Sequence, residues 1–102
     1  MPKQEDHVSK QSTTVSDELT IVNKLGLHAR AASKLAQLCQ QFSAKITLSL
    51  EQKEADANSI MAIMLLAGAQ GKIVKVTAQG IDAPEALTAI SKLICDKFDE
   101  AE

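Results

Sequence analysis

His28 stands where a short turn leads into a helix, and its neighbours are suited to binding an anion. The turn spans residues 23–27, and the apolar spacing that follows predicts a helix over residues 29–41. The first turn of a helix has unpaired backbone N–H groups and a partial positive charge, which together favour a bound phosphate. Arg30 adds a fixed charge and a planar fork of donors. These residues fit phosphoryl transfer to His28, although a histidine at a helix start more often has only a structural role.

A phosphoryl acceptor must present a neutral imidazole as the nucleophile. Positive surroundings disfavour the imidazolium and also stabilise the phosphoryl group once it is attached, so one arrangement serves both states. No metal site and no cofactor are expected, because the cysteines Cys39 and Cys95 fall in separate helical patterns and no acidic residue lies at ligand spacing from His28. The only other histidine, His7, is expected to be solvated.

The composition indicates one small domain. The chain has 102 residues, of which 45 % are apolar, but it has no Trp or Tyr, so aliphatic side chains must build the core. The missing aromatics, the net charge of −2 and the pI of 5.6 disfavour an RNA-binding α/β sandwich and nucleic-acid binding in general. No segment resembles a membrane span or a signal peptide, and both cysteines are expected to be reduced core residues, which predicts a cytoplasmic protein.

Residues 1–17 are polar and aperiodic, which predicts a disordered tail, and residues 18–102 form the predicted domain. The last helix is expected to start at a cap formed by Asp82 and to carry apolar residues as far as Phe98. The order βαββαβα predicts an α+β fold, an open-faced sandwich in which three helices cover one face of a four-stranded antiparallel sheet. The expected strands are residues 18–22, 45–50, 54–57 (a weak edge strand) and 72–78, and the expected helices begin at residues 29, 60 and 83.

The middle helix, expected over residues 60–67, is apolar on nearly every side. Ser59 is placed to be its N-cap. A short helix on a small domain cannot bury all of this surface, so part of it is expected to be exposed as a partner surface.

Residues 23–32, with the sequence N-K-L-G-L-H-A-R-A-A, resemble the active-site motif of the HPr family, the histidine phosphocarriers of the bacterial phosphotransferase system (PTS). The resemblance continues through residues 58–61 and 71–76, covers roughly residues 18–99, and is closer in detail to the nitrogen-related branch (NPr). It implies the same open-faced sandwich.

The resemblance implies a role for several residues. His28 would take the phosphoryl group on Nδ1, and Arg30 would be the active-site arginine. Ser59 matches a position that a kinase phosphorylates in some branches, although a plain helix cap is the preferred interpretation. The phosphate-binding residues implied are Ala29, Arg30 and Ala31, and the implied partner interface is Leu27, Ala29, Ser33, Ile60, Met61 and Met64.

The implied function is that of a monomeric carrier, not a stand-alone enzyme, that takes phosphate from an enzyme I-type phosphotransferase and passes it to an EIIA-type protein. The alternative is a regulatory module that binds target proteins through the helix starting at Ser59, with phosphorylation setting the affinity. One residue departs from the family, because Ala31 stands where most members have Pro. Alanine keeps the helix but frees the unfolded chain, which predicts a loss of roughly 0.4–1 kcal/mol in stability.

Overall fold

The computed structural model describes residues 13–100 of the chain. Their element order confirms the predicted βαββαβα pattern and adds a short 3-10 helix at its end. The elements are β1 (Thr13–Thr20), α2 (Ala29–Cys39), β2 (Lys45–Leu50), β3 (Lys53–Asp56), α3 (Ile60–Leu65), β4 (Ile73–Gly80), α4 (Ala83–Cys95) and η1 (Lys97–Asp99).

The four strands form one sheet in the order β1-β4-β2-β3, with every neighbouring pair antiparallel. In the two central strands every second residue is buried from Ile46 to Leu50 and from Val74 to Ala78, as expected when one face of a sheet packs on a core and the other faces solvent. The weak edge strand is confirmed as β3, in which only Ala55 is buried. The buried residues of the central strands are Ile46, Leu48, Leu50, Val74, Val76 and Ala78.

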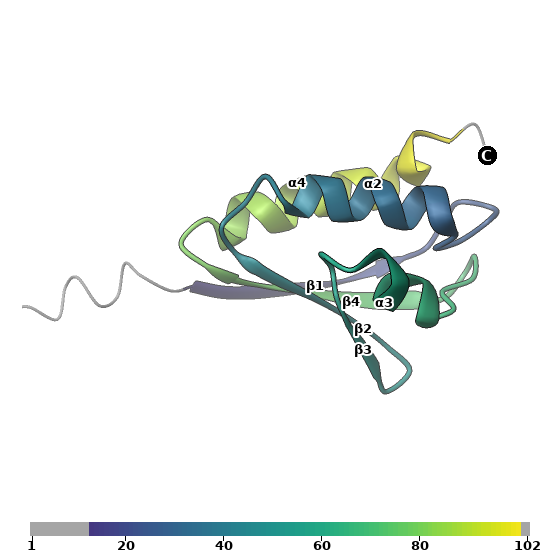
Figure 1. The fold of residues 1–102 in the computed structure, drawn as a ribbon, viewed down its shortest axis with the longest axis horizontal. Coiled ribbons are helices and arrows are strands. Elements are labelled where there is room, and N and C mark those ends of the chain that lie inside the picture. The colour runs from purple at the N-terminus through teal and green to yellow at the C-terminus, as the bar shows by residue number, and fades with distance from the viewer. Residues whose placement is uncertain (1–12, 101–102) are drawn as a thin grey trace, which may run out of the picture.

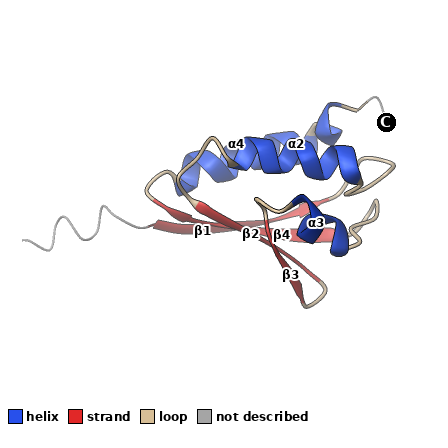
Figure 2. Ribbon diagram, in the orientation of Figure 1, coloured by secondary structure: helices blue, strands red, loops and turns tan. Residues whose placement is uncertain are grey.

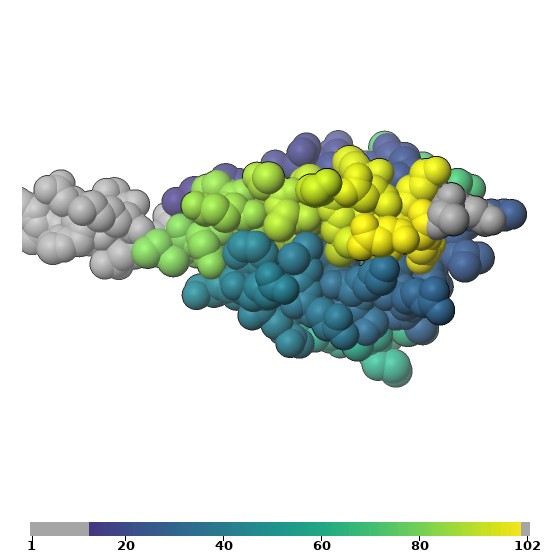
Figure 3. Space-filling model, turned by 90° about the horizontal axis from the view of Figure 1, so that it is seen from above, coloured from purple at the N-terminus to yellow at the C-terminus, as the bar shows by residue number. Residues whose placement is uncertain are grey.

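The helices form a second layer over the sheet (Figures 1 and 2). Helices α2 and α4 lie side by side on it (Figure 3), and α3 packs against α2 and β3. Leu35 of α2 and Ile90 and Ile94 of α4 are fully or almost fully buried between the layers. The predicted open-faced sandwich is therefore confirmed.

Cys95 corrects one expectation about the core. Cys39 is buried, and burial together with the charge of Asp56 raises the pKa of its thiol to about 12. Cys95 is also a free thiol, but it is exposed. It follows Ile94 by one residue, and one residue turns about 100° around a helix, which carries Cys95 away from the face that α4 buries.

The first strand begins earlier than the sequence predicts. Residues 13–17, assigned to a disordered tail, pair with β4 as part of β1, with Thr13 opposite Gly80. Their side chains are mostly exposed and mostly polar, so this part of β1 shows little of the apolar alternation that predicts a strand. Residues 1–12, and with them His7, lie outside the described residues.

Asp82 precedes α4 as expected, but its side chain does not cap that helix. Its two carboxylate oxygens accept hydrogen bonds from the backbone N–H groups of Ser43 and Ala44, each at 2.8 Å. Asp82 therefore connects the start of α4 to the chain that enters β2, and its side chain does not accept from the backbone N–H groups of its own helix.

Candidate functional site

The turn before His28 is held by contacts that set the direction of the chain. Gly26 has a φ of 67°, and a Cβ there would collide with the carbonyl oxygen of Gly68 in the α3–β4 loop. Leu27 donates its N–H to that same carbonyl at 2.8 Å. The side chain of Asn23 closes the turn by donating to the Gly26 carbonyl at 2.8 Å. Glycine at position 26 is therefore required both for the backbone angle and for the close approach.

His28 occupies the N-cap position of α2 with extended backbone angles, and its imidazole does not cap the helix. The side chain is 27 % exposed, so the ring is held yet accessible. The first turn of α2 contains no acidic residue, which leaves the positive end of the helix uncompensated by its own side chains. The position has the properties expected of an anion site next to a nucleophile.

Arg30 and Ala29 are exposed at the start of α2, as an anion-binding role requires. Arg30 lines the same open groove as His28, which has a volume of about 530 Å³. Ala31 is completely buried, so only its backbone N–H is left to serve a phosphate. The lining of the groove is mostly charged and consists of Lys24, Leu25, His28, Arg30, Lys34, Asp99 and Glu100.

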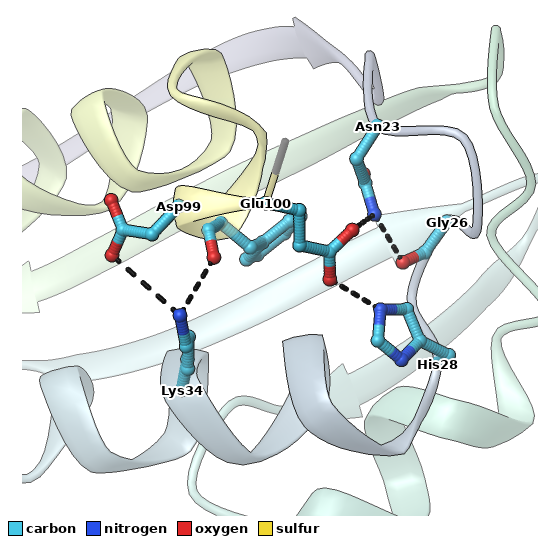
Figure 4. Close-up of polar contacts among 7 residues, drawn as sticks. Asn23, Gly26, His28, Lys34, Asp99 and Glu100 are labelled. Atoms are coloured by element: carbon cyan, nitrogen blue, oxygen red, sulfur yellow. Dashed lines mark hydrogen bonds and ion pairs between the residues drawn. The ribbon is translucent and has the colours of Figure 1, made fainter. Parts of the chain in front are cut away.

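Glu100 is a site residue that the sequence did not reveal. One of its carboxylate oxygens lies 2.5 Å from Nε2 of His28, and the other accepts a hydrogen bond from Nδ2 of Asn23 at 3.1 Å (Figure 4). Burial alone would raise the pKa of this carboxyl, but the hydrogen bonds from His28 and Asn23 and the charge of Arg30 outweigh burial and lower it. The surroundings of His28 are therefore mixed in charge, which corrects the expectation of positive groups alone.

The chain after α4 turns back sharply to bring Glu100 to this position. Lys97, Phe98 and Asp99 have φ angles of 60°, 55° and 63°, in the left-handed region that side chains disfavour. The full burial of the Phe98 side chain offsets the cost of these backbone angles. The ammonium of Lys34 in α2 also donates a hydrogen bond to the Phe98 carbonyl at 2.9 Å. The expected helix to Phe98 therefore ends earlier, and the reversal places Glu100 beside a residue 72 positions away.

Helix α3 confirms the expected exposed apolar surface. Ile63 and Leu66 are buried, whereas four other apolar side chains of its first two turns face solvent. Ser59 is confirmed as the N-cap, since its hydroxyl accepts from the backbone N–H of Ala62 at 3.1 Å. We call the exposed side chains the α3 patch: Ile60 (40 % exposed), Met61 (70 %), Met64 (40 %) and Leu65 (72 %).

Of the other expected interface residues, Leu27 does not fit. It is only 5 % exposed, because the turn at Gly26 directs it into the core, where it lies against Gly68. Ser33 is half-buried and Ala29 is exposed. The surface beside His28 is therefore formed by Ala29 and Leu25, which is 67 % exposed, and not by Leu27.

Within residues 13–100, no three His, Cys, Asp or Glu side chains are close enough together to hold a metal ion. The same residues include no helix with the length and hydropathy needed to cross a membrane.

Comparison with known proteins gives consistent matches over most of the chain. The family model for the phosphorylation site of the PTS HPr component matches residues 15–96. The phosphocarrier protein HPr of Xylella fastidiosa is 47 % identical over 83 residues, or 81 % of this chain and 93 % of that protein. The phosphocarrier protein NPr of Shewanella violacea is 46 % identical over 89 residues, or 87 % and 98 %. The crystal structure of HPr from Thermoanaerobacter tengcongensis matches with a TM-score of 0.83 and 41 % identity, covering 86 % and 99 %.

These matches, with an accessible histidine at the start of a helix in an open-faced sandwich, define the class of histidine phosphocarriers. The chain belongs to the HPr family of the PTS, and the resemblance seen in residues 23–32 is confirmed.

Proposed function

We propose that His28 is the residue through which this chain acts as a phosphocarrier, taking a phosphoryl group on Nδ1 and passing it on. The observation that carries the proposal is the position of His28 at the N-cap of α2, accessible in a groove that Arg30 also lines. The N–H groups of the first turn and the Arg30 guanidinium are the donors that would hold the phosphoryl oxygens. Transfer in such a site depends on positioning and charge stabilisation more than on covalent chemistry by the protein.

The phosphoryl donor is an enzyme I-type phosphotransferase charged by phosphoenolpyruvate, and the acceptor is an EIIA-type protein. Relatives from the HPr and NPr branches match almost equally well, so both sugar-type and nitrogen-type acceptors belong in the test. We further propose that the carrier is cytoplasmic. We also propose that it is monomeric, because one face is then free to meet successive partners in turn.

The α3 patch also supports a second role, as a regulatory module that binds a target protein through an exposed apolar surface. A phosphate on Ser59 would add negative charge at the start of α3 and change the affinity for such a target. This role is compatible with phosphoryl transfer, since both would use the same side of the molecule.

The deciding experiment incubates the protein with an enzyme I-type phosphotransferase and labelled phosphoenolpyruvate. We expect label on the protein that is lost in acid and stable in base, as a phosphohistidine is. The His28→Ala variant should take up no such label, and the matched His7→Ala variant should label like wild type. Label of the same stability on His28→Ala would refute the assignment.

A further inference from the structure

We propose that Met61 and Met64 form a reversible oxidation site on the α3 patch, where a hydroperoxide converts their thioethers to sulfoxides and so weakens partner docking. The inference rests on the proposed function, because it takes the α3 patch as the surface on which the phosphoryl donor docks. It adds a modification site that makes transfer through His28 sensitive to oxidants.

Methionine is concentrated on this one surface of the described chain. The sequence has three methionines, of which Met1 lies outside the described residues, and the other two both belong to the α3 patch. Met61 and Met64 are three positions apart on α3, so their side chains are neighbours on the helix surface. Oxidation of methionine within residues 13–100 therefore changes the α3 patch and no other surface.

Both thioethers are open to an oxidant that arrives from solvent. Met61 is 70 % exposed and Met64 is 40 % exposed. A thioether has no proton to lose before it reacts, so access to the sulfur determines how fast it is oxidised. Met61 should therefore be oxidised before Met64.

The two cysteines, which are the other sulfur groups, are placed differently. Cys39 is buried, and burial together with the charge of Asp56 raises the pKa of its thiol to about 12, so it stays protonated and unreactive. Cys95 is exposed, but it belongs to α4, which packs against α2, β1 and β4, whereas α3 packs against α2 and β3. Cys95 therefore offers a control for oxidation outside the α3 patch.

The oxidation step balances with hydrogen peroxide as the hydroperoxide. A lone pair on the methionine Sδ attacks one peroxide oxygen, the S–O bond forms as the O–O bond breaks, and the leaving oxygen keeps that electron pair. The proton of the transferred hydroxyl passes to the leaving oxygen, which departs as water. Sulfur is oxidised by two electrons and the peroxide is reduced by two. A dithiol acting through methionine sulfoxide reductases reverses the change, with the sulfoxide oxygen released as water and the dithiol converted to a disulfide.

A sulfoxide changes the chemistry of the surface at the point where a partner would sit. It replaces a flexible apolar group with a polar one. Docking removes the patch from water, so a sulfoxide oxygen that finds no donor in the interface loses its hydration without compensation. The cost typical of such a group weakens docking by about tenfold.

The fold of α3 does not depend on the exposed sulfur atoms. Ile63 and Leu66 anchor the helix in the core, and the Ser59 hydroxyl caps its start. The oxidised protein should therefore keep its fold, and the effect of oxidation should be confined to docking.

The competing interpretation is that the two methionines serve docking alone, since flexible and polarisable side chains suit a surface that meets several partners. Oxidation would then be incidental and would leave docking unchanged. The two interpretations differ in the KM that they predict for the oxidised carrier.

The test treats the purified carrier with hydrogen peroxide, removes the excess with catalase and then adds the charged donor enzyme. It compares wild type with the double variant Met61→Leu, Met64→Leu, whose side chains have a similar volume but no sulfur, and with the matched control Cys95→Ser. For each protein the readout is the ratio of the KM for phosphoryl uptake after treatment to the KM before it. Peptide mass mapping locates each added oxygen, and thermal unfolding verifies the fold.

Wild type and Cys95→Ser should gain oxygen on Met61 first and then on Met64, and their KM should rise about tenfold with the maximal rate unchanged. Treatment with sulfoxide reductases and a dithiol should return the KM to its starting value. The double variant should show the same KM before and after peroxide, and Met61→Leu alone should show a smaller rise than wild type.

A wild-type KM that stays constant while peptide masses show both sulfoxides would overturn the proposal, as would an equal rise in the double variant. Methionines that stay unmodified at a peroxide concentration that oxidises free methionine, or an oxidised protein that no longer unfolds cooperatively, would overturn it too. If the double variant does not fold, Met61→Leu decides in its place, and a full wild-type rise there counts against the site. An untreated wild-type protein that takes up no label refutes the proposed function instead, while the peptide masses and their reversal by the reductases still judge the oxidation site.

Discussion

His28 shares its groove with two groups of opposite charge. Arg30 is exposed at the start of α2, where the oxygens of a phosphoryl group on Nδ1 would be held, and Glu100 contacts the other ring nitrogen. A guanidinium presents several donors in one plane and is always charged, so it can bind phosphate oxygens in pairs. The site therefore combines His28 and Arg30, from the start of α2, with a carboxylate from the C-terminal segment.

Replacement of Arg30 tests the anion binder. Arg30→Ala should slow phosphoryl uptake by about 100-fold, because a fixed donor aimed at developing negative charge typically contributes on that scale. Arg30→Lys should recover part of the rate, since it restores the charge without the fork. Stopped-flow transfer from the labelled donor measures both.

The control is Lys75→Ala, which removes an exposed cation from the middle of β4. It should leave the rate unchanged. An equal loss in Lys75→Ala would mean that overall charge, and not the position of Arg30, controls the rate.

At the scale of elements, α2 carries both the site and a large part of the core. Its buried face holds Leu35 and Cys39, and its first turn leaves Arg30 exposed, so the same helix anchors the site in the core. Ala31 lies in that first turn and is buried, in place of the proline usual in the family. Helix propensity still favours the element, but the unfolded chain has more freedom with Ala than with Pro.

Ala31→Pro should raise the free energy of unfolding by roughly 0.4–1 kcal/mol, because proline restricts the unfolded chain and its missing N–H belongs to the unpaired first turn. Urea denaturation followed by circular dichroism measures the change. A decrease would show that the packing around Ala31 has no room for the ring, and would refute the expected gain.

At the scale of the whole molecule, the turn before His28 and the loop after α3 lie against each other, through Gly26 and Leu27 on one side and Gly68 on the other. The contact between this turn and this loop therefore connects the helix that carries the α3 patch with the turn that leads to His28. We therefore expect a partner that docks on exposed Met61 and Leu65 to be able to reach His28 as well.

Met61→Asp should raise the apparent KM for phosphoryl uptake roughly tenfold if partners dock on the α3 patch, because a charge replaces one of its large exposed apolar side chains. The fold should be unaffected, since Met61 is 70 % exposed. Steady-state transfer at several carrier concentrations separates KM from the maximal rate.

Ile81→Asp is the matched control. Ile81 is 67 % exposed and directly follows the C-terminal end of β4. The other end of β4 is the one near the turn that leads to His28, because Ile21 donates its N–H to the carbonyl of Lys72 there. Its KM should stay at the wild-type value. Equal changes in both variants would contradict a specific role for the α3 patch.

The features that depend on near neighbours could be predicted from the sequence. Spacing along the chain predicted His28 and Arg30 at a helix start, the strand Lys45–Leu50, and the Ser59 cap of an apolar helix. Each follows from local periodicity, capping chemistry or a short motif, and all of these act within a few residues.

Which distant groups meet became clear only from the folded chain. Glu100 reaches His28 across 72 positions, and Asp82 leaves its own helix to bind the backbone of Ser43 and Ala44. Leu27 turns inward, and its side chain lies against Gly68. Such contacts depend on the packing of the whole chain, and in the case of Glu100 on left-handed residues stabilised by the burial of Phe98, a balance that no local pattern records.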